Sequence, residues 1–166
     1  SLEGFDEVEL HIVGDSHSVF SGSDYRLEGD PRVRVLGRLD DEQLVREYQG
    51  ATAFVFPSLY EGFGIPPLEA QACGLPVAAM NGWGVPEAVA DGETGLLSPV
   101  GDVSTFAENI ARLVTDEALR SRMGEAGAAR VRERFDRSVA AERIEAALIA
   151  AVAANKAAQG NERTAA

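Results

Sequence analysis

Short apolar stretches alternate with amphipathic stretches along the chain, which is the pattern of strands that alternate with helices. The apolar stretches predict strands at residues 8–13, 33–36, 53–56, 77–80 and 95–97. The amphipathic stretches predict helices at 40–49, 65–73, 86–89 and 106–114, a charged helix ending near Arg134 and an alanine-rich helix from about Arg137. Residues 16–31 lack periodicity, so we expect a loop there with at most a short helix.

This alternation indicates an α/β fold with a Rossmann-like, doubly wound parallel sheet. Ligands of such sheets bind beyond the carboxyl ends of the strands. The loops that follow Val13, Leu36, Phe56 and Met80 all leave such ends. We therefore expect these four loops to converge on one edge of the sheet.

Two local signals support the predicted helices. Asp40 and Gln43 have the spacing of a capping box at the start of the first predicted helix. In the alanine-rich helix, Ile144, Leu148 and Val152 recur every four residues and form an apolar stripe. The residues after that stripe become small and polar.

The length and composition indicate one globular domain. A chain of 166 residues is long enough for one hydrophobic core and too short for two. We place the domain at residues 1–158 and expect the polar tail at 159–166 to fray. Hydrophobic residues make up 45% of the chain, which excludes a disordered protein.

The charge and the single cysteine narrow the possible partners and compartment. A net charge of −12 argues against binding to nucleic acid or to an anionic lipid surface. No apolar run approaches the roughly 20 residues of a membrane span, and no signal peptide is visible. Cys73 has no second cysteine to pair with and suits a reducing compartment, so we expect a cytoplasmic location.

The most informative segment follows the third predicted strand, at residues 53–56. Glu61 lies in a glycine-rich loop, and Glu69 lies eight residues later inside the next helix. Gly62 and Gly64 allow the backbone to approach a ligand closely. Because Glu69 is about one turn into the helix, its face can look back toward the loop.

The start of this helix is suited to an anion. Pro66 and Pro67 fit the first turn, where no amide hydrogen is required. The remaining unpaired amides and the helix dipole give this terminus about half a positive charge. A pyrophosphate or a polyhydroxylated ring would fit between Glu61 and Glu69.

This segment and the sequence around it resemble the retaining nucleotide-sugar glycosyltransferases of group 1, or family 4, which have the two-domain GT-B fold. The resemblance covers roughly residues 7 to 135, in order and at the family's spacing. The matching residues are Gly14, Val35-Leu36-Gly37, Pro57-Ser58, Glu61-Gly62-Phe63-Gly64, Pro67-Leu68-Glu69-Ala70, Ala72-Cys73-Gly74, Pro76-Val77, Pro86-Glu87, Asp91-Gly92, Thr94-Gly95-Leu96-Leu97 and Asp102.

The resemblance implies that the chain is the C-terminal half of a GT-B fold and binds a nucleotide-sugar donor. The full-length enzyme would transfer a hexose from a nucleoside-diphosphate sugar to an acceptor held by a separate N-terminal domain. It would be cytoplasmic, with a membrane-peripheral position as the alternative. The family generally uses no metal at the donor, and we expect no cofactor.

The resemblance also implies roles for individual residues. Glu61 would lie beside the transferred sugar at the reacting centre, and Glu69 would accept hydrogen bonds from the ribose hydroxyls. The amides of Gly62, Phe63 and Gly64, with the helix start at Ile65, would hold sugar hydroxyls or phosphate oxygens. The alternatives are a dipole-stabilised carboxylate for Glu61, a solvated one for Glu69 and a simple tight turn for the glycines.

Five further residues bear on the site, and some of them have two interpretations. Leu39 and Asp41 follow the place where family members hold the base, but Asp41 equally suits the first turn of a helix. Trp83 stands where the family usually has small residues, and it either covers the sugar pocket or packs. His11 is interpreted as a core residue, and His17 either faces the cleft or does not.

Part of the family's pattern is missing from this chain. Residues 1–10 do not match the strand and helix that carry the diphosphate-binding Arg and Lys, so the first strand and helix are expected to be absent. A sheet without its central strand would have a gap, which a partner strand, self-association with another copy or residues 8–13 would fill. We expect the chain alone to bind donor weakly and to be inactive.

Three other functions fit the sequence less well. A non-catalytic module for nucleotide-sugar binding or protein interaction is the main alternative, although the intact Glu61 and Glu69 argue against it. A dinucleotide dehydrogenase would need the Gly-x-Gly-x-x-Gly fingerprint, of which Gly14-Asp15-Ser16 has one glycine. A phosphorylase would need a cofactor lysine, and the only lysine, Lys156, lies among the C-terminal residues that we expect to fray, so this function is excluded.

Overall fold

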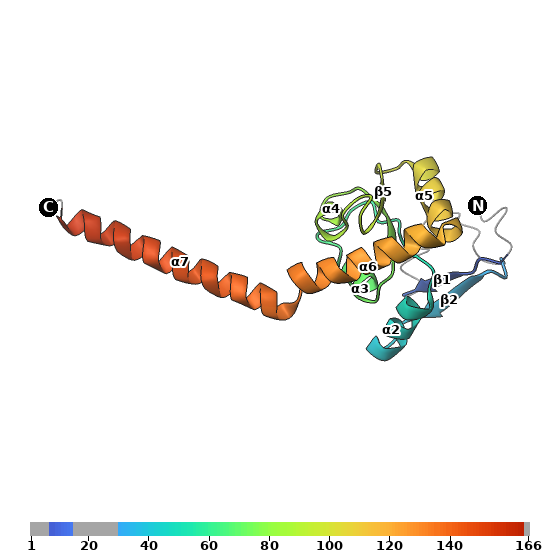
Figure 1. The fold of residues 1–166 in the computed structure, drawn as a ribbon, viewed down its shortest axis with the longest axis horizontal. Helices are drawn as coiled ribbons and strands as arrows, with labels where there is room; N and C mark the ends of the chain where they lie inside the picture. The colour runs from blue at the N-terminus through green and yellow to red at the C-terminus, as the bar shows by residue number, and fades with distance from the viewer. Residues whose placement is uncertain (1–6, 15–29, 165–166) are drawn as a thin grey trace. The chain divides into compact units, whose positions relative to one another are not determined.

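The computed structural model describes residues 7–14 and 30–164, with side chains up to residue 153. The chain forms two compact units, Ser1–Glu47 and Tyr48–Ala166. Figure 1 labels the elements of both units. Most of the predicted loop at 16–31, including His17, lies outside the described residues. The prediction of one domain over residues 1–158 stays a prediction.

The first unit contains a two-stranded parallel sheet. β1 (Leu10–Val13) pairs with β2 (Val33–Gly37), and the register shifts between Ile12 and Val13. Helix α2 (Asp41–Gly50) follows, and its last three residues belong to the second unit. Both strands and the helix lie within a residue or two of their predicted limits.

The predicted capping box at the start of α2 is confirmed. The backbone amide of Gln43 donates to Oδ1 of Asp40 at 2.8 Å, and the amide of Asp40 donates to Oε1 of Gln43 at 3.0 Å. This reciprocal pair satisfies two amides that the helix itself cannot bond. Asp40 therefore fixes the residue at which α2 begins.

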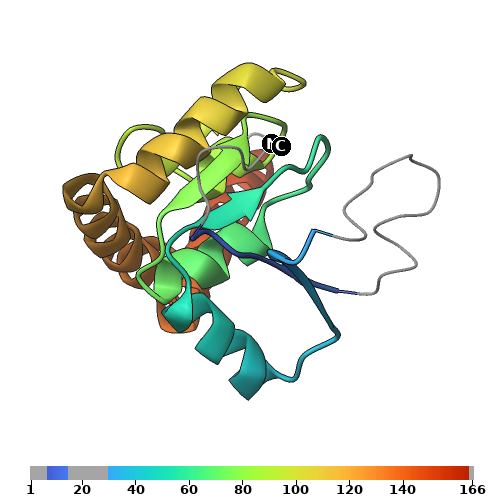
Figure 2. The same ribbon diagram turned by 90° about the vertical axis from the view of Figure 1, so that its right-hand side faces the viewer.

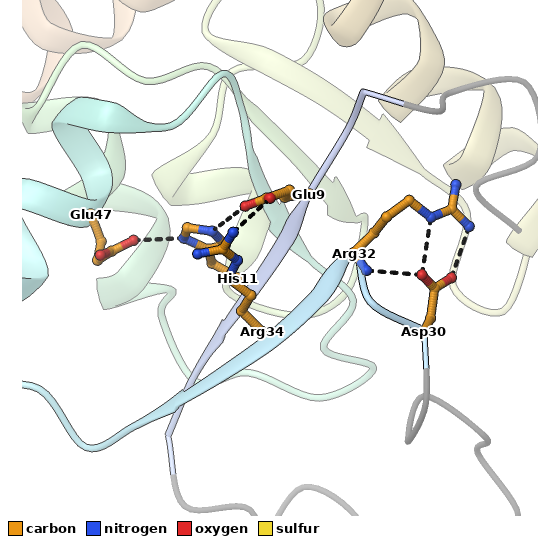
Figure 3. Close-up of polar contacts among 6 residues, drawn as sticks. All are labelled: Glu9, His11, Asp30, Arg32, Arg34 and Glu47. Atoms are coloured by element: carbon orange, nitrogen blue, oxygen red, sulfur yellow. Dashed lines mark hydrogen bonds and ion pairs between the residues drawn. The ribbon is translucent and has the colours of Figure 1, made fainter.

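Charged side chains link β1, β2 and α2 on an exposed face of the first unit, as Figure 3 shows. His11 on β1 contacts Glu47 at 2.8 Å and Glu9 at 3.3 Å, and Glu9 accepts a hydrogen bond from Arg34 at 2.8 Å. The interpretation of His11 as a core residue is therefore wrong. Strand alternation places Leu10 and Ile12 on the more buried face and His11 on the opposite, exposed one.

The second unit contains a three-stranded parallel sheet in the order β3–β4–β5. Its strands are β3 (Phe54–Phe56), β4 (Val77–Met80) and β5 (Gly95–Ser98). Its helices are α3 (Ile65–Ala72), α4 (Val85–Ala88), α5 (Val103–Thr115), α6 (Glu117–Arg134) and α7 (Arg137–Thr164). Figure 2 shows α3 and α5 on either side of these strands.

The core of the second unit lies against both faces of β4. All four residues of this strand are buried, which is typical of a parallel strand covered by helices on both sides. Ala78 and Met80 belong to a cluster whose other members come from β5, α5 and α6: Leu96, Phe106, Leu113, Leu119 and Met123. Side chains alternate along a strand, so Val77 and Ala79 face the other side, where α3 packs.

Helices α5 and α6 begin at aspartate caps. Asp102 accepts hydrogen bonds from the amide of Thr105 at 3.0 Å and from its hydroxyl at 2.7 Å. Asp116 accepts from the amide of Leu119 at 2.9 Å. Side-chain caps of this kind stabilise a helix by about 1 kcal/mol each.

Helix α7 continues to Thr164 and exposes the apolar side chains of Ile144, Leu148, Ile149 and Val152. The residues of the predicted tail up to Thr164 are therefore helical, and the fraying of its end stays a prediction. No helix among the described residues combines the length and the apolar character that crossing a membrane requires.

The α/β class with parallel strands and intervening helices is confirmed. The described strands form two sheets, one in each unit, where a single sheet was expected. Among these strands, β1 pairs only with β2, and β3 pairs only with β4. How a central gap would be filled therefore stays a prediction.

Candidate functional site

The predicted site residues Glu61, Gly62, Phe63, Gly64, Ile65 and Glu69 all belong to the second unit. A loop carries the first of them from the carboxyl end of β3 to the start of α3. Ile65 and Glu69 are four residues apart on α3, so they share one face of that helix. The loop and the first helical turn thus form one continuous segment.

The turn into α3 depends on Gly64. This residue is the N-cap and has φ 94° and ψ 50°, the left-handed region that favours glycine. Its missing side chain also matters, because a Cβ there would lie 3.3 Å from Cβ of Ala88. Prolines follow in the first turn of α3, as predicted. The sharp turn directs the chain from the loop into the helix.

Three successive backbone amides are free at this turn. Among the described residues, the amides of Phe63, Gly64 and Ile65 have no hydrogen-bond acceptor. No side chain caps this end of α3. Free amides at a helix start, together with the helix dipole, are the usual features of an anion-binding site.

Glu61 is half-buried in the loop. Its Oε1 accepts a hydrogen bond from the amide of Gly62 at 3.0 Å. Its backbone carbonyl accepts from the amide of Gly84 at 3.1 Å, which links this loop to the loop after β4. The second carboxylate oxygen, Oε2, has no partner among the described residues and is available to a ligand.

Glu69 is exposed and accepts a hydrogen bond from a buried tyrosine. The Tyr48 hydroxyl donates to Oε2 of Glu69 at 3.3 Å. Tyr48 is only 8% exposed and packs edge-to-face on Phe54 of β3, with ring centroids 5.5 Å apart. Burial and the charge of Glu69 raise the pKa of Tyr48, so its hydroxyl remains a donor. The charge of Glu69 also adds to burial in raising the pKa of Cys73.

Sequence reasoning missed Tyr48. It lies 21 residues before Glu69, and no spacing rule joins a tyrosine near the end of one helix to a glutamate on another. The available signal was an aromatic residue on a polar helix next to a strand of aromatic residues.

A buried glutamine and two glycines position α3. Gln71 is fully buried, and its Nε2 donates to the carbonyls of Pro67 at 3.0 Å and Ala88 at 3.1 Å. Gly127 of α6 packs directly against Gln71. At Gly124, a Cβ would lie 2.1 Å from the carbonyl oxygen of Gly74. Close packing against α6 therefore fixes the helix that carries Glu69.

Phe63 connects the loop to the junction between α6 and α7. Its ring meets the ring of Phe135 at 5.9 Å, and Arg130 lies over the Phe135 ring at 5.7 Å. Arg130 also donates to the carbonyl of Glu87 at 2.9 Å. These contacts join the loop, α4 and α6, so the loop rests on a packed support.

The two predicted base-binding residues belong to the first unit. Leu39 is half-buried, and Asp41 is an exposed acid in the first turn of α2. The structure thus gives Asp41 the alternative role of a first-turn helix acid, and its role at a base stays a prediction. No group of three or more His, Cys, Asp or Glu within the described ranges is placed to hold a metal ion.

The sequence profile of the family described as glycosyl transferases group 1 matches residues 2–130. The chain therefore belongs to that family. It is 35% identical over 141 residues to the capsular polysaccharide biosynthesis glycosyltransferase CapM of Staphylococcus aureus. That match covers 83% of this chain and 37% of CapM, so the chain spans less than two fifths of that relative.

Solved structures agree on the fold. Anabaena HepE in complex with UDP-glucose has a TM-score of 0.74 and 26% identity, covering 87% of this chain and 42% of HepE. The C-terminal domain of a group 1 glycosyltransferase from Francisella tularensis has a TM-score of 0.58 and 28% identity, covering 64% of this chain and 55% of that one. The chain corresponds to the C-terminal, Rossmann-like domain of a GT-B protein.

Proposed function

We propose that this chain is the donor-binding domain of a retaining glycosyltransferase. The full-length enzyme transfers a hexose from a nucleoside-diphosphate sugar to an acceptor held by a separate N-terminal domain. The observation that carries the proposal is the row of free amides at Phe63, Gly64 and Ile65, with Glu61 before it and Glu69 one turn after it. The UDP-glucose complex of the structurally similar HepE supports the choice of ligand.

The free amides and the α3 dipole stabilise the departing diphosphate. Negative charge grows on the phosphate as the bond to the sugar breaks, and fixed dipoles that meet this charge are usually the largest catalytic contribution. Because Gly64 and the packed α3 hold these amides in place, they need no rearrangement during the reaction. In the family, an Arg and a Lys add positive charge to this dipole.

Glu69 accepts hydrogen bonds from the two ribose hydroxyls. A carboxylate suits this role because its two oxygens can accept from vicinal hydroxyls at once. Tyr48 restricts the rotation of the carboxylate by donating to one of its oxygens. The tyrosine therefore acts as a positioning residue for the nucleotide.

Glu61 orients the hexose at the reacting centre. Its Oε2 is the free acceptor at the loop, and Oε1 is held by the Gly62 amide. Retention at the anomeric carbon fits a front-face attack within an ion-pair-like state, for which the sugar must be held in one orientation. Leu39 and Asp41 hold the base, and no cofactor or metal takes part.

Donor binding tests this proposal. Saturation-transfer NMR should detect UDP-glucose, GDP-mannose or ADP-glucose on the chain, and calorimetry at high concentration should give its affinity. Glu69→Ala should weaken that affinity about 10- to 150-fold, because a charged hydrogen bond contributes roughly 1.5–3 kcal/mol. Glu133→Ala is the matched control, an exposed helical glutamate with no bonded partner among the described residues. Unchanged affinity in Glu69→Ala would contradict the ribose assignment.

Turnover is the second test. A coupled assay for released nucleoside diphosphate should give no signal with this chain alone, because the proposal assigns acceptor binding to a separate domain. Rapid turnover by the chain would show that these parts are not needed.

A further inference from the structure

Two aromatic side chains beside Glu61 are left in water. Tyr60 is 72% exposed and Trp83 is 73% exposed. Their ring centroids are 5.0 Å apart, and their planes are inclined by 58°. Large aromatic rings gain stability from burial, and folding has not buried these two. The interpretation of Trp83 as a packed residue is therefore wrong.

Trp83 is also held in an unfavourable backbone conformation. Its φ is 48°, and it is the single non-glycine residue with positive φ in the described part of the chain. This conformation is unfavourable for a bulky side chain, so the surrounding structure must impose it. Strain of this kind concentrates at binding sites.

Two loops pack together to impose this conformation. The amide of Gly84 donates to the carbonyl of Glu61 at 3.1 Å, and the amide of Val85 donates to the carbonyl of Gly82 at 3.0 Å. A Cβ at Gly84 would lie 2.2 Å from the carbonyl oxygen of Gly62, so only glycine allows this approach. The loop after β4 is thus fixed against the loop that carries Tyr60 and Glu61.

The chemistry of this corner matches a sugar ring. A pyranose has an apolar face of C–H groups, which an aromatic ring can cover, and hydroxyls around its edge, which a carboxylate can bond. Tyr60 and Trp83 offer the aromatic faces, and the neighbouring Glu61 offers a free oxygen. Apolar surface with a few fixed polar groups is the usual composition of a small-molecule site.

We propose that Tyr60 and Trp83 form an aromatic platform that binds a pyranose ring, with Glu61 accepting from its hydroxyls. This inference rests on the proposed function, because it places a sugar at Glu61. The ring belongs either to the hexose of the donor or to the acceptor glycan, and the experiment below separates these sources.

Trp83 is the only tryptophan in the chain, so its fluorescence reports on the platform alone. We would titrate the chain with UDP-glucose, GDP-mannose and ADP-glucose, and with UDP, GDP and ADP, called bare diphosphates because they carry no sugar. Methyl glycosides and maltotriose form the third group of ligands. Sugar-bearing ligands should change the emission, and bare diphosphates should not. A change with sugar nucleotides alone assigns the donor hexose, and a change with free glycosides assigns the acceptor glycan.

Two results would overturn the platform. Equal changes with bare diphosphates would mean that the rings stack on a base. No change with any ligand, while calorimetry detects a sugar nucleotide, would remove the platform and leave the proposed function intact. If calorimetry detects no nucleotide, the proposed function fails, and the free glycosides alone then decide on the platform.

Variants complete the test. Trp83→Ala and Tyr60→Ala should each weaken binding of the sugar-bearing ligand about tenfold, as loss of buried ring area predicts, and leave bare diphosphate affinity unchanged. Trp83→Phe should restore most of the affinity. Leu59→Ala, which removes a 58% exposed side chain of the same loop, is the control. An equal loss in that control would overturn the platform.

Trp83→Gly separates a binding role from a structural one, because stability and ligand affinity should change in opposite directions. Glycine relieves the positive φ, so the melting temperature should rise while affinity for the sugar-bearing ligand falls. If stability and affinity both fall, the strained conformation serves the fold and the platform assignment is wrong.

Discussion

The two units of the chain differ in what stabilises them. In the second unit, Leu113, Met123 and the whole of β4 are buried in a core between sheet and helices. In the first unit, none of the described residues up to Glu47 is buried, and the side-chain hydrogen bonds belong to exposed or half-buried charged residues and a capping box. Exposed ion pairs contribute about 0–1 kcal/mol each and weaken with salt.

This difference bears on the site. The loop from Glu61 to Ile65 and the carboxylate of Glu69 belong to the unit with the core, and Leu39 and Asp41 belong to the other. We therefore expect the proposed phosphate and sugar contacts to survive conditions that open the first unit. The proposed base contacts should be more sensitive to those conditions.

Leu113→Ala is expected to lower stability the most, because it removes part of the core of the second unit. Leu113 is 0% exposed in the core cluster, so its truncation should lower the free energy of unfolding by about 2–5 kcal/mol. The control is Leu148→Ala, whose side chain is 62% exposed on α7 and should change stability by less than about 0.5 kcal/mol. Urea unfolding followed by circular dichroism compares them, and equal losses would disprove the described core.

Gly124→Ala tests the close contact between α6 and α3. The new Cβ would meet the carbonyl of Gly74, and backbone would have to move. Overpacking should cost about 1–3 kcal/mol, even though alanine is the better helix former. Thermal unfolding measures the loss, and a gain in stability would show that the two helices are further apart. Gly50→Ala, with open space around its Cβ, is the control.

Tyr48→Phe tests the positioning of Glu69. Loss of one hydrogen bond to the carboxylate should weaken donor affinity by about 0.5–1.5 kcal/mol, or roughly 2- to 12-fold, with the ring packing retained. Calorimetry measures this change. Combining Tyr48→Phe with Glu69→Ala should add no further loss, and additive losses would show that the tyrosine acts independently.

The smallest expected effect is a pH dependence of the first unit. The hydrogen bond from His11 to Glu47 and the contact with Glu9 raise the pKa of His11 above its ordinary value of about 6.5. Protonated His11 therefore stabilises the unit fully below that value, and the contribution is lost as the pH rises through the raised pKa. With partly exposed partners it should be about 0.2–1 kcal/mol.

Hydrogen exchange of amides in β1 and α2 at several pH values measures this contribution. Protection factors correct the exchange rates for their intrinsic pH dependence. In His11→Gln, the protection factors of β1 and α2 should no longer change between the ordinary and the raised pKa of His11. The protection factors of β4 amides should not change over this pH range in either protein. If the pH dependence of the first unit persists in His11→Gln, another titrating group causes it.

Much of the fold could be predicted because it depends on local signals. The limits of β4 follow from four apolar residues between a proline and an asparagine, and the start of α2 follows from the capping box at Asp40 and Gln43. The start of α3 after Gly64 follows from the paired prolines. Each signal acts within a few residues.

The errors concern contacts between distant residues. A core position for His11 follows from its place in mid-strand and from the lack of a Ser, Cys or metal-ligand companion at useful spacing. Strand alternation and Glu47, 36 residues away, place it on a charged surface instead. The contact between Tyr48 and Glu69 and the packing of Gly124 on Gly74 likewise depend on how elements meet in space. Spacing in the sequence holds no information about such pairs.

An amide titration by NMR tests the central claim most directly. The chain labelled with nitrogen-15 would be titrated with a nucleoside-diphosphate sugar, using the matching nucleoside without phosphate as control. The account predicts that the amide signals of Phe63, Gly64 and Ile65 shift most with the sugar nucleotide and little with the nucleoside. If these three signals stay unmoved while the ligand is bound and others shift, the diphosphate does not lie at the start of α3.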